Sequence, residues 1–294
     1  MRRSLLLLVL AALAAATTLA AHQAPADGAG PAGDAGAPRA RVDRFDGPAA
    51  WRWLRRQVAL GPRPAGSPAS RRLGLLLREA LPGGRYQPVA GGLRNVIGTV
   101  PGRDARRLVV VGAHYDTKDI PGFVGANDGA SGTAVVAELA RTVKPRTLRP
   151  TVVFIFFDGE EAPAGAADAD FLARGLRGSK TAAPGFRGAE AMVLLDFVGN
   201  RGLSLSRESN SDARLWARLR AAAARVGVGA VFPRTQQGAI LDDHLPFIEA
   251  GVPSIDLIDF SFPCWHRVCD DLTAVSPRSL DATGEAVLEL LRSL

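Results

Sequence analysis

The chain has few of the residues on which several protein classes depend. Its 294 residues include two cysteines, too few for a disulfide-framework mini-protein or a zinc module built on four cysteines. After the first 21 residues there is no long apolar run, which excludes a polytopic membrane protein. Only three of the cations are lysine, and no basic run is interleaved with aromatic residues. Despite the formal net charge of +7, we therefore expect no nucleic-acid partner.

The N-terminus has the pattern of an export signal. Arg2 and Arg3 precede an apolar run over residues 5–16, and a small-residue cleavage site follows at 18–20. Residues 1–20 are therefore predicted to be a signal peptide, and the protein to be secreted or periplasmic. The alternative is a retained membrane anchor, because residues 4–21 have about the minimum length that spans a bilayer. A stable membrane partner is expected only in that case.

Composition changes again after the signal. Residues 21–41 are rich in Ala, Gly, Pro and Asp and show no periodicity, which predicts a disordered linker. Residues 42–294 are then long enough to form one catalytic domain with a substantial core.

Apolar periodicity predicts alternating strands and helices in this domain. The expected strands cover residues 94–100, 107–112, 151–157, 191–197 and 253–258. The expected helices cover residues 51–60, 68–81, 131–141, 211–226, 245–250 and 277–294, and Ser67 or Ser70 could cap the second of them. This alternation is typical of an α/β fold with a mostly parallel sheet.

Polar residues follow the predicted buried strands directly. His114 and Asp116 follow the second strand, Glu160 and Glu161 the third, and Asp196 lies at the end of the fourth. In an open α/β sheet these strand ends share one edge, where ligands bind, so the three segments are expected to converge. Asp116 is expected either to orient a ligand or to cap the strand end.

Beyond the linker the chain has only three histidines, and each has acidic neighbours. They are His114, His244 and His266. Histidine and carboxylate are common zinc ligands. A single histidine is more often structural than ligating, but the shared acidic context of all three favours a metal site.

Two carboxylate motifs point to the same chemistry. Glu160 and Glu161 are adjacent and would repel each other, which a cation resolves if one binds the metal and the other moves protons. The alternative is a solvated pair in a loop. Asp128 lies in the glycine-rich segment VGANDGASG, which has no Lys-Ser/Thr pair and so is not a P-loop. An aspartate in this loop is well placed to bind a cation.

Taken in order, these segments resemble the zinc aminopeptidase, or co-catalytic zinc exopeptidase, superfamily. Within it they resemble the glutaminyl-peptide cyclotransferases most closely. The segments are HYD, GANDGASG, FDGEEA, LLDFVGN, DDHLPFIEAGVP and a WH followed by DD, and they extend from His114 to Asp271. The resemblance implies a mixed, mostly parallel central sheet flanked by helices.

The resemblance implies one of two metal sites. In the cyclotransferase branch one zinc ion would be held by Asp128, Glu161 and His266. In the aminopeptidase branch a second zinc ion would add His114 and Asp196, with Asp128 bridging the two ions. The corresponding activities are cyclisation of an N-terminal glutamine to pyroglutamate with release of ammonia, and removal of N-terminal residues. Both act on peptides or proteins with a free N-terminus.

The cyclotransferase branch also implies roles around the metal. Glu160 would move protons, Asp196 and Asp242 would form a carboxylate network, and Trp265 would border the substrate pocket. An acid before the Asp-His pair and a tryptophan before His266 favour this branch. Asp256 departs from the family pattern, which often has histidine there. An inactive binding ectodomain is a third possibility, although every candidate ligand and Glu160 are present.

The two cysteines, Cys264 and Cys269, lie on either side of His266. In an exported protein a short-loop disulfide between them is expected and would fix the loop that carries the histidine. The alternatives are two free thiols or metal ligation, which would need more soft ligands than the chain has.

Overall fold

The computed structural model describes residues 36–294. The predicted signal at 1–20 and most of the predicted linker at 21–41 lie outside these residues, so the division of the chain stays a prediction. The packed chain begins a little before the predicted start of the domain, because Ala37 is buried and the Arg41 N–H donates to the Val226 carbonyl at 2.7 Å. No helix within 36–294 is long and apolar enough to cross a membrane.

A six-stranded mixed sheet forms the centre of this region, with strand order β1-β2-β4-β3-β5-β6. Strand β1, at one edge, pairs antiparallel with β2, and β2 pairs antiparallel with β4, whereas β4, β3, β5 and β6 run parallel to one another. The strands are β1 (Arg85–Val89), β2 (Leu93–Val100), β3 (Asp104–His114), β4 (Pro150–Phe157), β5 (Ala191–Leu195) and β6 (Ser254–Leu257).

The parallel strands are apolar because both faces of the sheet are covered. Along β3, Val109 and Val111 belong to the larger core, while Val110 between them belongs to the smaller core on the other face. The same alternation continues in β4 with Phe154 and Ile155. This explains why these strands read as continuous apolar runs rather than as alternating patterns.

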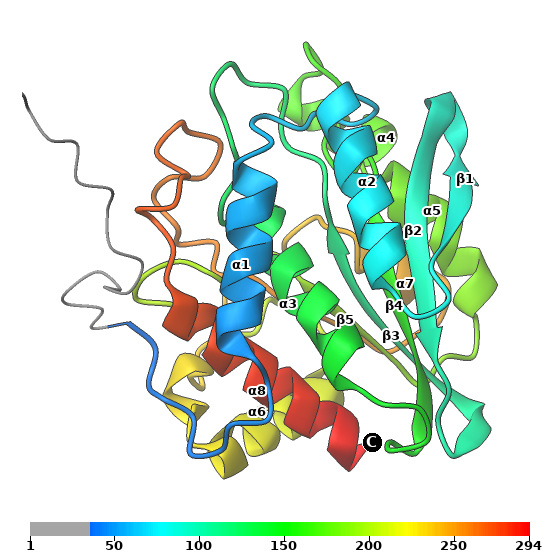
Figure 1. The fold of residues 1–294 in the computed structure, drawn as a ribbon, viewed down its shortest axis with the longest axis vertical. Coiled ribbons are helices and arrows are strands. Elements are labelled where there is room, and N and C mark those ends of the chain that lie inside the picture. The colour runs from blue at the N-terminus through cyan, green and yellow to red at the C-terminus, as the bar shows by residue number, and fades with distance from the viewer. Residues whose placement is uncertain (1–35) are drawn as a thin grey trace, which may run out of the picture. The chain divides into compact units, whose positions relative to one another are not determined.

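Helices cover the two faces unequally (Figure 1). Those packed on the larger core are α1 (Gly47–Val58), α2 (Pro68–Ala80), α3 (Ala130–Thr142), α6 (Ala213–Val226) and α8 (Pro277–Ser293). The other face is covered by α5 (Arg177–Ala182) and α7 (Leu245–Glu249). At the start of α2 the Ser67 hydroxyl accepts from the Ser70 N–H at 3.1 Å, so Ser67 is the cap. The predicted mixed sheet flanked by helices is confirmed.

The sequence did not predict several short elements. They are β1, the helix α4 (Phe171–Arg174), α5, and the 3-10 turns η1 (Ala90–Gly92), η2 (Asp168–Asp170), η3 (Ala183–Phe186) and η4 (Gly229–Val231). Strand β5 also ends at Leu195, two residues earlier than predicted, which leaves Asp196 in the loop beyond the sheet. The carboxyl ends of β3, β4 and β5 therefore open toward one edge, as the parallel register requires.

Candidate metal and catalytic site

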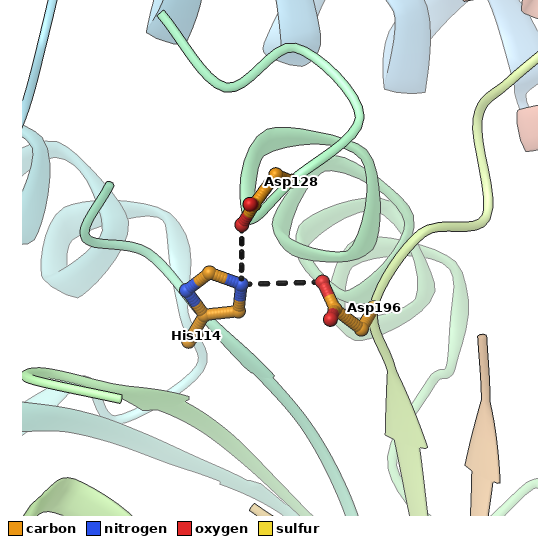
Figure 2. A group of neighbouring side chains, drawn as sticks. All are labelled: His114, Asp128 and Asp196. Carbon is orange, nitrogen blue, oxygen red and sulfur yellow. Dashed lines mark hydrogen bonds and ion pairs between the residues drawn. The ribbon is translucent and has the colours of Figure 1, made fainter. Parts of the chain in front are cut away.

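The first group of candidate ligands, which we call the inner cluster, consists of His114, Asp128 and Asp196 (Figure 2). His114 is the last residue of β3, Asp128 precedes α3, and Asp196 follows β5. The His114 Nε2 lies 3.3 Å from Asp128 Oδ1 and 3.2 Å from Asp196 Oδ1. All three side chains are buried. Two strand ends and the loop before α3 thus bring three possible metal ligands together.

The second group, the outer cluster, consists of Asp128, Glu161 and His266. The His266 Nε2 lies 3.1 Å from Glu161 Oε1 and 3.6 Å from Asp128 Oδ2. The ammonium of Lys118 lies 3.1 Å from the other oxygen of Glu161. Asp128 belongs to both clusters and presents one carboxylate oxygen to each.

The position of Asp128 depends on its neighbours. Gly129 has φ +79°, and a Cβ there would lie 2.9 Å from the His114 ring, so this turn requires glycine. The Asp270 carboxylate accepts from the N–H groups of Asn127 at 2.7 Å and Asp128 at 3.0 Å. Burial, with the nearby charge of Asp128, raises the pKa of Asp270 to about 7. This aspartate therefore fixes the backbone of the shared ligand.

Asp116 does the same for the loop after β4. Its carboxylate accepts from the N–H groups of Gly159 at 3.0 Å, Glu160 at 3.2 Å and Glu161 at 3.2 Å. One of its oxygens also lies 3.8 Å from the His114 Nδ1. Asp116 thus both terminates the strand end and orients the loop that carries the two glutamates.

Glu160 lies beside the clusters without belonging to either. Its carboxyl is 3.9 Å from the His114 Nδ1, and burial followed by the charge of Glu161 raises its pKa well above the ordinary value. Burial likewise raises the pKa of Asp196 and of Asp242. A carboxyl with a raised pKa holds a proton more readily than an ordinary one, which suits a group that must both accept and donate it.

The pKa values of the two cluster histidines are also raised, but by their carboxylate partners and against the effect of burial. Burial disfavours a charged His114, but hydrogen bonds to Asp116, Asp128 and Asp196 outweigh it and raise the pKa of the imidazole. For His266, burial is likewise outweighed by the hydrogen bond and charge of Glu161, so its pKa is also raised. Both clusters therefore attract positive charge, whether as protons or as a metal ion.

The donor set fits a metal ion such as zinc. One imidazole and carboxylate oxygens in each cluster are the ligand types that zinc takes. Asp128 Oδ2, which faces the outer cluster, is buried and has no hydrogen-bond partner among the described residues. A buried carboxylate oxygen without a partner is costly, and a cation would satisfy it.

A cavity of about 640 Å³ opens onto the outer cluster. Its polar wall includes all three outer-cluster residues together with Lys118, Glu160, Asp196 and Asp242. Its apolar wall includes Phe171, Phe197, Ile240, Phe260 and Trp265. Trp265 is 42% exposed and stacks on the His266 ring at 4.5 Å between centroids. His114 is not among the residues that line this cavity.

The third histidine lies elsewhere. The buried His244 has Nε2 3.2 Å from Glu208 Oε1 and Nδ1 3.8 Å from Asp256 Oδ2. Burial followed by the charge of Asp242 raises the pKa of Asp256. His244 therefore joins a buried group of acids behind Asp242, so only two of the three histidines belong to the clusters.

The predicted disulfide is present between Cys264 and Cys269, and it encloses His266. Sequence reasoning missed two other groups at the site, Lys118 and Asp270 as a backbone acceptor. Lys118 carried a weak signal, because one of only three lysines in the chain follows the HYD segment closely. The hydrogen bonds of Asp270 depend on tertiary placement, which no local pattern reveals.

Comparisons with known proteins identify the family of the chain. Residues 95–291 match Peptidase family M28. The glutaminyl-peptide cyclotransferase of Bos taurus is 32% identical over 226 residues, which cover 64% of this chain and 62% of that protein. The chain spans about three fifths of the length of the curated relatives it matches.

Solved structures extend the likeness over most of the chain. Porphyromonas gingivalis glutaminyl cyclase superposes with a TM-score of 0.75 at 32% identity, covering 86% of this chain and 99% of that one. A leucine aminopeptidase precursor from Bacteroides thetaiotaomicron gives 0.77 at 26% identity, covering 87% and 99%. The inferred resemblance is thus confirmed, and because the family match covers more than half of its length, the chain belongs to Peptidase family M28.

Proposed function

We propose that the protein is a zinc-dependent glutaminyl-peptide cyclotransferase, which converts an N-terminal glutamine of peptides to pyroglutamate and releases ammonia. The observation that carries this proposal is the single cavity around which the outer cluster, Glu160 and Asp242 converge. The similarity to glutaminyl-peptide cyclotransferases supports it. Peptides with a free N-terminus are then the partners. Export is proposed from the signal pattern, and a disulfide is in keeping with it.

Asp128, Glu161 and His266 would hold one zinc ion, because the outer cluster borders the cavity whereas His114 of the inner cluster is 1% exposed. When bound, zinc supplies Lewis-acid polarisation of the substrate's γ-carbonyl. Lys118 beside Glu161 limits the excess negative charge of the acidic wall.

Glu160 would move the proton. It takes a proton from the α-amine as the amine nitrogen attacks the γ-carbonyl carbon, and the new C–N bond closes the ring. It then gives the proton to the departing amide nitrogen as the old C–N bond breaks, so that ammonia leaves. Its raised pKa suits both steps, because the carboxyl must first accept and then donate.

Asp242 and Asp196 would orient the leaving group from the cavity wall. Because burial raises the pKa of both carboxyls, a proton retained on either of them can be donated to the substrate amide. Trp265 would border the substrate, since it lines the same cavity and stacks on His266.

A second candidate function is a two-zinc aminopeptidase. The intact inner cluster favours it, because His114 and Asp196 are placed to hold a second ion next to Asp128. The likeness to a leucine aminopeptidase precursor is consistent with this alternative.

Product analysis separates the two functions. Residues from 36 onward are expressed, supplied with zinc and given a peptide that begins with glutamine, and the products are followed by mass spectrometry. Loss of ammonia from an intact peptide, faster than the spontaneous rate, supports cyclisation. Release of free glutamine would instead establish the aminopeptidase, and an unchanged peptide would contradict both activities. The Glu160→Gln variant, with zinc still bound, is the matched control.

A further inference from the structure

His266 differs from the other candidate ligands in how its backbone is held. His114 ends a strand, and the backbones of Asp128 and Glu161 are fixed by Asp270 and Asp116. His266 lies in the loop between β6 and α8 and has φ +52°. A residue with a Cβ rarely adopts this left-handed conformation unless its surroundings impose it.

The disulfide is the constraint nearest to that backbone. Cys264 and Cys269 close a small ring that contains His266. Within it the Arg267 N–H donates to the Cys264 carbonyl at 3.0 Å, and just after it the Asp270 N–H donates back to the Arg267 carbonyl at 2.9 Å. The tip of this loop makes little packing contact with the rest of the protein, since Val268 is 62% exposed. The backbone around His266 is thus restrained by a covalent bond, whereas the backbone of His114 is restrained by strand pairing.

The ring also acts through side chains. Trp265, inside the same ring, stacks on the His266 imidazole, and the Phe123 ring lies perpendicular to the imidazole with 6.1 Å between centroids. With the loop held, the Nε2 points at Glu161 and Asp128. A loop free to relax to negative φ would turn the imidazole away from those carboxylates.

We propose that the Cys264–Cys269 disulfide positions His266 for metal binding, and that its reduction weakens the affinity of the outer cluster for zinc. This inference rests on the proposed metal site. It makes the two cysteines positioning residues and the site sensitive to dithiol reductants.

The chemistry is a two-electron exchange. A thiolate of the dithiol attacks the sulfur of Cys269, which is the more exposed cysteine, and the S–S bond breaks as the Cys264 thiolate leaves and takes a proton. The second thiol of the reductant then displaces Cys269 and forms the reductant's own disulfide. Both cysteines end reduced, and the dithiol ends oxidised.

The test measures the zinc dissociation constant by equilibrium dialysis of four proteins: the wild type, Cys264→Ser/Cys269→Ser, His266→Ala, and the triple variant. We expect loss of the disulfide to raise the dissociation constant about tenfold or more when His266 is present, and less than about twofold when it is alanine. An equal effect in both backgrounds, or a wild-type change below twofold, would overturn the proposal.

Two controls show whether a change in zinc affinity is due to loss of the disulfide. Wild-type protein reduced with a dithiol and desalted without oxygen must show the same loss of affinity, while the double serine variant treated identically must not change. This pair separates the disulfide from metal stripping by the reagent and from misfolding of the variant. A wild type that binds no zinc overturns the proposed metal site itself, and with it this inference, whereas normal wild-type binding without a disulfide effect overturns the inference alone.

Discussion

The inner and outer clusters share Asp128 and have similar ligand types, yet they differ in access and in support. In the inner cluster, Asp128 and Asp196 line the cavity but His114 does not: it is 1% exposed, and its Nε2 lies within 3.3 Å of both carboxylates. The outer cluster opens onto the cavity, and the His266 side chain is 23% exposed. The two clusters therefore differ in the exposure of their histidines rather than in ligand type.

The inner cluster has a second use that needs no metal. Because the pKa of His114 is raised, its imidazole can keep a proton and neutralise Asp128 and Asp196. It then orients Asp128 so that the other carboxylate oxygen faces His266. Under the proposed function, the inner cluster would support the ligands and the outer cluster would hold the catalytic zinc.

The largest effect is expected from Glu160→Gln. The amide cannot accept the amine proton, so kcat for cyclisation should fall by roughly 10²–10⁴-fold. Because Glu160 belongs to neither cluster, zinc affinity should stay within about twofold of wild type. Steady-state kinetics and zinc dialysis check both values, and a variant with more than a tenth of wild-type kcat would refute the role of Glu160.

A matched pair of histidine variants tests which of the two clusters binds the first zinc ion. His266→Ala should weaken binding of the first zinc equivalent by more than the roughly 10–100-fold that loss of a metal ligand's supporting partner costs. For His114→Ala, the loss of zinc affinity should fall within or below that roughly 10–100-fold range, because His114 supports the ligand Asp128 and is not itself a ligand of this zinc. Equilibrium dialysis of both proteins decides, and a reversed order would assign the catalytic zinc to the inner cluster.

The pH profile should report on Glu160. Burial and the charge of Glu161 raise the pKa of this carboxyl, and the reaction needs it deprotonated to accept the amine proton. As pH falls through the raised pKa, kcat/KM should therefore decline, beginning above the roughly 4.3 of an unperturbed glutamate. Rates are measured at saturating zinc, because protonation of His266 also releases metal. A folded, zinc-loaded enzyme with constant kcat/KM down to that pH would contradict this role.

A smaller effect is expected from Asp116→Asn. The amide oxygen can still accept from the loop of Gly159 to Glu161, but the charge near His114 and half of the acceptor capacity are lost. We expect kcat/KM to fall about tenfold. Kinetics beside a thermal unfolding curve check this, and unchanged kcat/KM in a folded variant would mean that the loop holds its own position.

Much of the fold could be predicted because burial leaves a strong pattern. Strands β3, β4 and β5 are covered on both faces and so read as apolar runs, and helices such as α2 carry a cap at Ser67. Strand β1 could not be predicted in this way. Its sequence RYQPV lies at the sheet edge, where it needs few apolar residues and tolerates Pro88.

The candidate site likewise contains residues that sequence patterns predict and residues that they do not. His114, Glu161 and Asp196 follow strands, so their convergence could be predicted from the strand ends, whereas Asp128 was predicted from its glycine-rich loop before α3. His266 came only from its acidic context and from the resemblance. By contrast, His244, Glu208 and Asp256 lie on three separate segments of the chain. Only folding brings them together, so no local pattern could predict their contacts.

The most direct test of the central claim is a zinc titration of metal-free protein, read as cyclisation of a glutamine-initiated peptide. The account predicts that cyclase activity rises linearly and reaches its maximum at one zinc per chain, with ammonia and the cyclised peptide as the products. Activity that appears only after the second equivalent, or that releases free glutamine, would contradict a single catalytic zinc in the outer cluster.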